Sequence, residues 1–187
     1  MSFAKDVFLL MASQCRKAGV PFVLVGGFAV NFHNVTRNTE DVDFLMTEEN
    51  FEKARPFLKE AGYSQVIKQH LFVRVRKDED IEGRFLDIDI LFTDSQTFNA
   101  ILSDACDLDL GEDKIKVVSL NHLLAMKLHS LKNNPDGRED PDMTDLTKLV
   151  RFNRLDVRAH PFKELCLKYG NESIYDRILK RVTHGQA

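Results

Sequence analysis

The sequence has few of the features that mark secreted or membrane proteins. It contains no tryptophan and only three cysteines, Cys15, Cys106 and Cys166, which are far apart and form no Cys-x-x-Cys pair. We therefore expect neither a disulfide framework nor a cysteine-based zinc site, and a reducing cytoplasm fits this usage best. No apolar run reaches the ~18 residues of a transmembrane helix, and the first residues lack the apolar segment of a signal peptide. A membrane role is not expected.

Internal repeats and low-complexity segments are also missing. The 187 residues are enough for one domain with a small appended lobe, and the 43% hydrophobic content is typical of a globular protein with a buried core. The charge is uneven, because residues 146–187 hold 9 Lys/Arg against 4 Asp/Glu, while the whole chain has a net charge of −3. Such a basic segment can meet RNA or an acidic protein partner, although solvated helix surface is the more common explanation.

The hydrophobic pattern predicts strands and helices in alternation, followed by helices alone. Predicted strands occupy residues 21–25, 42–46, 71–76, 85–92 and 114–118. Predicted helices occupy residues 3–17, 28–32, 48 (or 50)–61, 95–102 and 120–130, and three short helices follow from about residue 142. This order predicts an α/β or α+β fold, with a small mixed β-sheet flanked by helices. We expect a core over residues 1–118 and a helical C-terminal part over residues 119–187.

Two strands carry acids in a pattern that indicates a metal site. Asp41 and Asp43 alternate with apolar residues, as do Asp87 and Asp89, so each pair shares one face of its strand. If the two strands are neighbours, up to four carboxylates converge, and such groups repel one another unless a cation lies between them. Mg²⁺ is the usual cation where carboxylates and substrate phosphates meet. For an isolated pair of acids, a wet strand edge is the simpler interpretation.

Two further features have both a structural and a functional interpretation. Gly26-Gly27 follows a buried strand and opens a helix, a turn at which backbone N–H groups can approach a phosphate, although many such turns serve backbone geometry only. Lys127 lies on the otherwise apolar stripe of the helix at residues 120–130. A lysine there either extends to water or meets a buried anion.

Taken together, these motifs resemble the nucleotidyltransferase-fold superfamily. Val25-Gly26-Gly27 is followed after thirteen residues by Asp41-Val42-Asp43, and a distant apolar strand carries Asp89. The segment from Arg37 to Asp41 looks like the Arg-x-Thr-x-Asp-x-Asp variant of the minimal and abortive-infection toxin-like branch, the type IV toxin–antitoxin type. The helix around Lys127 is similar to the helix after the core in that branch. The resemblance covers about residues 20–146.

The resemblance implies a Mg²⁺-dependent transfer of NMP from an NTP to a hydroxyl acceptor, with release of pyrophosphate. Asp41, Asp43 and Asp89 would be the catalytic residues and the ligands of two Mg²⁺ ions. Asp87 shares the face of Asp89, and the choice of Asp89 as third ligand rests on the family's strand ending. Nucleotide and phosphate contacts would come from Gly26, Gly27, Arg37, Thr39 and Lys127.

The resemblance leaves the acceptor open among a protein side chain, a tRNA and a small molecule, and it implies an antitoxin as a further partner. A non-catalytic nucleotide-binding or interaction module of the same fold, for example in a toxin–antitoxin or defence system, is the alternative. Its support is Pro141, which precedes Asp142 where the toxin-like branch has a basic residue.

Overall fold

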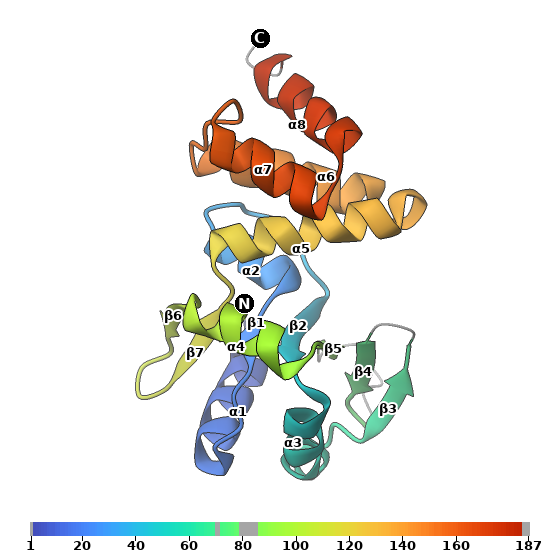
Figure 1. Ribbon diagram of the computed structural model, residues 1–187. Coiled ribbons are helices and arrows are strands. Elements are labelled where there is room, and N and C mark those ends of the chain that lie inside the picture. The colour runs from blue at the N-terminus through green and yellow to red at the C-terminus, as the bar shows by residue number, and fades with distance from the viewer. Residues whose placement is uncertain (1, 70–71, 79–85, 185–187) are drawn as a thin grey trace. The chain divides into compact units, whose positions relative to one another are not determined.

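The computed structural model describes residues 2–69, 72–78 and 86–184 and shows a mixed α/β fold (Figure 1). This confirms the predicted fold class. The strands are β1 (Val23–Leu24), β2 (Asp41–Met46), β3 (Gln65–Lys68), β4 (Phe72–Arg76), β5 (Asp87–Phe92), β6 (Cys106–Asp109) and β7 (Lys114–Val117). The helices are α1 (Ser2–Ala18), α2 (Gly26–Phe32), α3 (Glu48–Glu60), α4 (Ser95–Ser103), α5 (Leu120–Asn133), α6 (Pro135–Phe152), α7 (His160–Tyr169) and α8 (Glu172–His184). None of the helices in the described ranges is long and apolar enough to cross a membrane.

The chain divides into two compact units. The first contains residues 1–29 and 38–119, and the second contains residues 30–37 and 120–187. All of the strands above belong to the first unit, and α5 to α8 belong to the second. Helix α2 begins in the first unit and ends in the second, so the short segment 30–37 joins a unit that otherwise comes from the last third of the chain.

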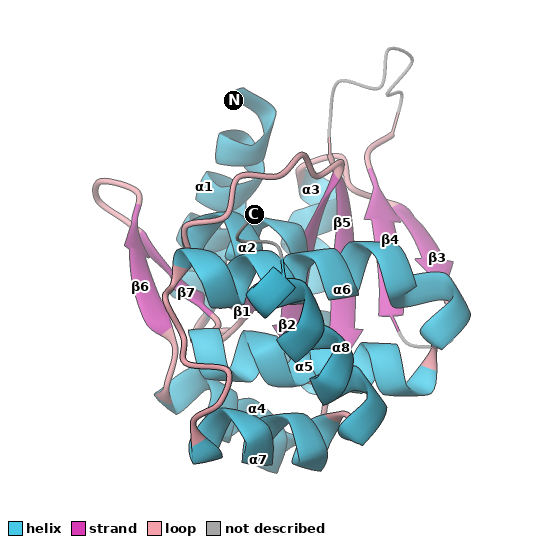
Figure 2. Ribbon diagram, turned by 90° about the horizontal axis from the view of Figure 1, so that it is seen from above, coloured by secondary structure: helices cyan, strands magenta, loops and turns pink. Residues whose placement is uncertain are grey.

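The first unit is built on one seven-stranded sheet, in the order β3-β4-β5-β2-β1-β7-β6. Strands β2 and β5 are parallel, as are β1 and β7, and the other neighbours are antiparallel, so the sheet is mixed. Figure 2, in which strands are magenta, shows β5, β4 and β3 side by side at one end of the sheet. Strands β4 and β5, both of which the sequence predicts, pair in antiparallel orientation. Predicted strand residues 71 and 85 lie outside the described ranges.

One face of the sheet is apolar because alternate residues of the central strands are fully buried there. Val42, Phe44 and Met46 of β2 are 0% exposed. Helix α3 covers this face near β5, where the rings of Phe51 and Phe92 lie 5.6 Å apart. Helix α3 begins after an N-terminal cap, since the Thr47 side chain accepts a hydrogen bond from the backbone N–H of Asn50. Helices α1 and α3 are in contact beside each other (Figure 1).

Two edge strands and half of a helix differ from the sequence-based expectation. Strands β3 and β6 lie at the two edges of the sheet, and each has only 4 residues, none of them fully buried, so the hydrophobic signal for a strand is weak there. Helix α6 begins at Pro135 and continues through Pro141, whereas we expected helix only from about residue 142. The proline weakens the local helix signal, but packing against α5 is retained across the segment that follows it.

Candidate active site

The predicted acids meet on the polar face of the sheet because β2 and β5 are parallel neighbours in matching register. Asp41 lies opposite Asp87, and Asp43 lies opposite Asp89. Side chains alternate along a strand, so these four acids point away from the apolar face that carries Val42 and Ile88. Asp89 is buried, at 5% exposure. The alternation seen in the sequence therefore becomes a compact group of carboxylates within the first unit.

Gly26 is required where Asp43 approaches the backbone. Its φ of +62° lies in the left-handed region, and a Cβ placed there would be 1.9 Å from Oδ2 of Asp43. The main chains are also joined, since the N–H of Val25 donates to the carbonyl oxygen of Asp43 over 2.9 Å. The first glycine of the pair therefore leaves the space that the Asp43 carboxylate occupies.

Gly27 leaves space for the side chain of Thr39. A Cβ at Gly27 would lie 2.5 Å from Oγ1 of Thr39. That hydroxyl is 3.3 Å from Oδ1 of Asp41 and 3.2 Å from the carbonyl oxygen of Asp41, and it donates its proton to this pair of acceptors. The two glycines, Thr39 and the two acids of β2 are thus assembled together, and Thr39 orients Asp41.

The sequence reasoning missed Arg74, which lies at the centre of this group. Its Nε donates to Oδ1 of Asp89 over 2.7 Å, and its Nη2 donates to Oδ2 of Asp89 over 2.6 Å. The same Nη2 is 3.2 Å from Oδ2 of Asp41, and Nη1 is 3.7 Å from Oδ2 of Asp87. The hydrogen bonds to Asp89, together with the charges of Asp89, Asp87 and Asp41, raise the pKa of Arg74. The guanidinium is therefore charged at every working pH.

A signal for Arg74 is present in the sequence. In β4, Arg74 and Arg76 alternate with Val73 and Val75, which are buried. The antiparallel register places Arg74 opposite Asp89, and Arg76 pairs with Asp87 over 2.8 Å. Two basic residues in alternation, next to a strand with two acids in alternation, indicate ion pairs across the ladder.

Arg37 and Lys127 belong to the second unit, where Asp145 joins them. Lys127 is buried, and its Nζ is 2.8 Å from Asp142 and 2.8 Å from Asp145. Arg37 reaches the same Asp145 with Nη1 at 2.7 Å, while Asn31 holds the Arg37 backbone through hydrogen bonds of 2.9 and 3.1 Å. The lysine on the apolar stripe therefore meets buried anions, which was one of the two expected outcomes.

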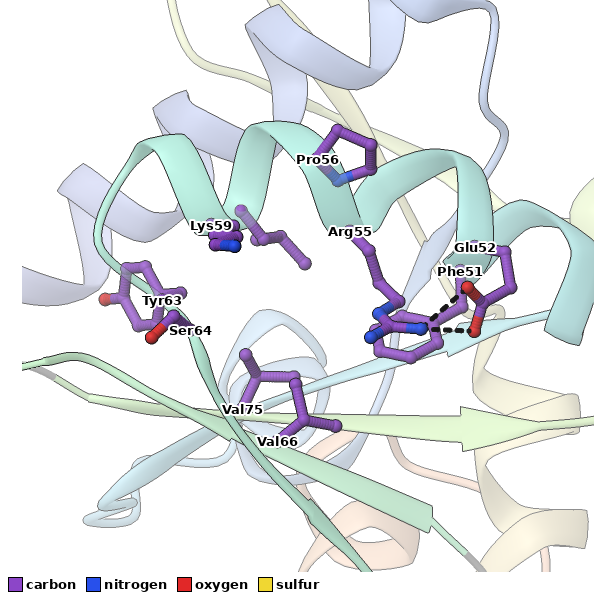
Figure 3. A pocket seen from close by; sticks show the side chains of 10 residues that line it. Phe51, Glu52, Arg55, Pro56, Lys59, Tyr63, Ser64, Val66 and Val75 are labelled. Carbon is purple, nitrogen blue, oxygen red and sulfur yellow. Dashed lines mark hydrogen bonds and ion pairs between the residues drawn. The ribbon is translucent and has the colours of Figure 1, made fainter.

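A pocket of about 400 Å³ lies elsewhere in the first unit (Figure 3). It is bounded by α3 and by Val66 and Val75 of β3 and β4, and the Arg55–Glu52 ion pair is at one end. Val75 is next to Arg74 on β4, and adjacent side chains of a strand point to opposite faces. The pocket is therefore on the other face of the sheet from the acids, and it contains none of the predicted site residues.

The donor set fits a hard divalent cation. Within the described ranges, no three His, Cys, Asp or Glu side chains are arranged as a ready metal-ligand set. Asp41 and Asp89 nevertheless converge on one cationic group, the guanidinium of Arg74, from neighbouring strands. Carboxylate oxygens are the ligands that Mg²⁺ prefers. The residues present are thus of the kind and on the strands that a magnesium site needs.

Comparison with solved structures identifies the fold. An antigenic nucleotidyltransferase-like protein from Paracoccidioides brasiliensis superimposes with a TM-score of 0.57 at 16% identity, over 97% of both chains. The antibiotic-resistance factor ANT(2'')-Ia gives 0.60 at 14% identity, again over 97% of both chains. The lincosamide antibiotic adenylyltransferase LnuA gives 0.54 at 15% identity, over 81% of this chain and 98% of that one. At these identities the likeness shows the fold, which is that of nucleotidyltransferases.

The family is shown by the sequence. The chain belongs to the family described as nucleotidyl transferase AbiEii toxin, type IV TA system, which matches residues 9–181. The match covers most of both compact units and every residue of the candidate site. Curated protein sequences gave no match. The chain is therefore a nucleotidyltransferase by family, as the motifs predict.

Proposed function

We propose that this protein transfers NMP from an NTP to a hydroxyl acceptor and releases pyrophosphate. The observation that carries the proposal is the register of β2 and β5, which places Asp43 beside Asp89 and Asp41 beside Asp87. Membership of a nucleotidyltransferase family supports the same reaction. The acceptor oxygen forms a bond to the α-phosphorus, the bond from that phosphorus to the bridging oxygen breaks, and pyrophosphate leaves with the bonding electrons.

The proposed roles follow the positions of the side chains. Asp41, Asp43 and Asp89 would hold two Mg²⁺ ions, which would supply positive charge to neutralise the triphosphate and the leaving group. Asp89 also takes the proton of the acceptor hydroxyl. Thr39 keeps Asp41 in place, as its 3.3 Å hydrogen bond indicates. The backbone N–H groups at Gly26 and Gly27 contact the triphosphate.

Arg37 and Lys127 are proposed to neutralise the triphosphate. Both are strong cations, and both are held by Asp145 in the second unit. The Lys127→Met variant should lose part of its stabilisation by Mg²⁺ and NTP. The matched Lys132→Met variant, which changes an exposed lysine of the same helix, should retain it. Equal stabilisation of the two variants would remove Lys127 from the triphosphate site.

The family also supports a partner protein and a toxic activity. We propose a cognate antitoxin, and a hydroxyl of a protein, a tRNA or a small molecule as acceptor. Labelled NTPs offered to the purified protein in cell extract distinguish the acceptors, since the label then appears in protein, in RNA or in small solutes. Toxicity on expression should disappear with Asp43→Asn.

The decisive test compares wild type with Asp43→Asn in thermal shift, with each NTP, with and without Mg²⁺. We expect stabilisation of the wild type only when Mg²⁺ and an NTP are both present, and none of the variant. If no NTP stabilises the wild type and no label is transferred, the proposal fails. Stabilisation without label transfer favours a non-catalytic nucleotide-binding module, an alternative supported by the engagement of Asp41 and Asp89 with Arg74.

A further inference from the structure

Arg74 contacts the cluster of strand acids more closely than an exposed surface ion pair would. It binds both oxygens of Asp89, at 2.7 and 2.6 Å, and approaches Asp41 at 3.2 Å. Asp89 has a side chain only 7% exposed, and that of Arg74 is 27% exposed. A bidentate pair of this kind has a fixed geometry, and breaking it leaves a buried charge. Arg74 therefore determines where Asp89 points.

The guanidinium of Arg74 and a divalent cation would bind the same carboxylates. Carboxylates on neighbouring strands repel one another, and either cation relieves that repulsion. The oxygens that Arg74 uses on Asp41 and Asp89 belong to residues that the proposed reaction assigns to Mg²⁺. Two cations that close together also repel each other, most strongly where water is excluded. The guanidinium and the divalent cation therefore compete for these oxygens.

We propose that Arg74 is a positioning residue that competes with the divalent cation. It keeps Asp41 and Asp89 oriented and close together before the metal binds, and the metal exchanges with the guanidinium. Arg74 thereby weakens metal binding in the absence of nucleotide and makes the site depend on metal and NTP arriving together. This inference rests on the proposed function, because it assumes that these acids bind a metal.

Arg76 provides a matched control. It is on the same strand and the same face, two residues from Arg74, and it carries the same charge. It pairs with Asp87 over 2.8 Å, and its side chain is 46% exposed. The Arg76→Met variant removes one positive charge from this face of the sheet and leaves the hydrogen bonds between Arg74 and Asp89 intact. It therefore separates the specific contact from a general change in charge.

The experiment is a calorimetric titration of the full chain with Mn²⁺, without nucleotide, on wild type, Arg74→Met, Arg74→Lys and Arg76→Met. Thermal unfolding without metal is measured in parallel. We expect Arg74→Met to bind Mn²⁺ tighter than wild type by about tenfold or more, because the competing charge is gone. The same variant should melt at a lower temperature without metal, because Asp41 and Asp89 then repel. Arg76→Met should bind Mn²⁺ as wild type does.

Arg74→Lys keeps the inference testable if Arg74→Met does not fold. A lysine is a compact charge that cannot engage both oxygens of Asp89, so we expect intermediate Mn²⁺ affinity. Equal or weaker Mn²⁺ binding in the Arg74 variants, with clear binding in wild type, overturns the competition and leaves the proposed metal-dependent function standing. If neither wild type nor any variant binds Mn²⁺, the competition fails, and the thermal-shift series with Mg²⁺ and each NTP then decides the metal-dependent function separately.

Discussion

At the scale of single residues, the Gly26-Gly27 pair leaves space for two side chains that pack against it. Gly26 leaves room for Asp43, and Gly27 leaves room for Thr39. The sequence suggests these glycines as phosphate contacts or as plain turn geometry. The structure adds a third reason for glycine at both positions, which is the close approach of the acid and of the hydroxyl that orients Asp41.

Replacing Gly26 by alanine should disturb both the fold and the site. The left-handed backbone costs about 1–2 kcal/mol for a non-glycine residue. Crowding against Asp43, whose Oδ2 would be 1.9 Å from the new Cβ, adds about 1–3 kcal/mol. We expect the free energy of unfolding in urea to fall by the sum of these effects, and Mg²⁺ with NTP to stabilise the variant less than wild type.

Gly19→Ala is the control for Gly26→Ala. Gly19 has the same φ of +62°, but a Cβ there would meet nothing within 4 Å. This variant should lose only the backbone contribution of about 1–2 kcal/mol and respond normally to Mg²⁺ and NTP. Equal effects of the two substitutions would mean that the approach of Asp43 to Gly26 does not matter.

The third carboxylate can be identified by comparing Asp89→Asn with Asp87→Asn. Asp89 is the more buried and lies opposite Asp43, while Asp87 lies opposite Asp41 and pairs with Arg76. We expect Asp89→Asn to reduce label transfer at least about a hundredfold, as loss of an acid–base group does, and Asp87→Asn to retain most of it. The reverse result would make Asp87 the third acid.

Among the elements, α6 is the one whose extent differs most from the expectation. It runs from Pro135 to Phe152 with Pro141 inside it, and Asp142 and Asp145 follow on its next turn. A proline within a helix removes one backbone hydrogen bond and clashes with the preceding turn. Retention of helix across this proline indicates that packing within the second unit outweighs its local cost.

Pro141→Ala should therefore stabilise the protein. Pro141 is exposed, so alanine loses little packing there, and removing a proline from a helix interior is worth up to about 3 kcal/mol. Urea unfolding measures the gain. Pro161→Ala is the matched control, because Pro161 is in the first turn of α7, where its missing N–H has no helical partner. A stabilisation of similar size at both positions would contradict the account of α6.

For the whole molecule, the division into two units places an ionic network inside the second. Asp145 of α6 joins Lys127 of α5 to Arg37 of the segment 30–37, so residues more than a hundred positions apart are held together. Lys127, Asp142 and Asp145 are all buried. A network like this constrains which segments can form the unit, because any other arrangement leaves charges buried without partners.

Lys127→Met should lower the free energy of unfolding by about 3–5 kcal/mol, because it removes the lysine that lies 2.8 Å from the buried Asp142 and Asp145. Adding Asp142→Asn should restore part of the loss by removing one of the two buried charges. Lys132→Met, at an exposed lysine in the last turn of α5, should cost less than about 1 kcal/mol. If Lys127→Met is as stable as Lys132→Met, the network does not support the fold.

The sequence by itself determined the mixed α/β class, the central strands and the acids that they carry. Those features depend on local patterns, since the period of two places Asp41 with Asp43 and Asp87 with Asp89 whatever the rest of the chain does. The edge strands β3 and β6 were not predicted in the same way, because each has only 4 residues and none of their side chains is fully buried, so the hydrophobic signal is weak.

Only the tertiary structure decided which charges meet. The hydrogen bonds of Arg74 to Asp89 depend on the register of β4 against β5. The ion pairs of the buried Lys127 with Asp142 and Asp145 depend on how α5 packs on α6. Gly26 and Gly27 could be recognised as a turn, but their neighbours Asp43 and Thr39 come from residues that follow later in the chain. Pairings of this kind are set by contacts across the fold, which a local pattern does not contain.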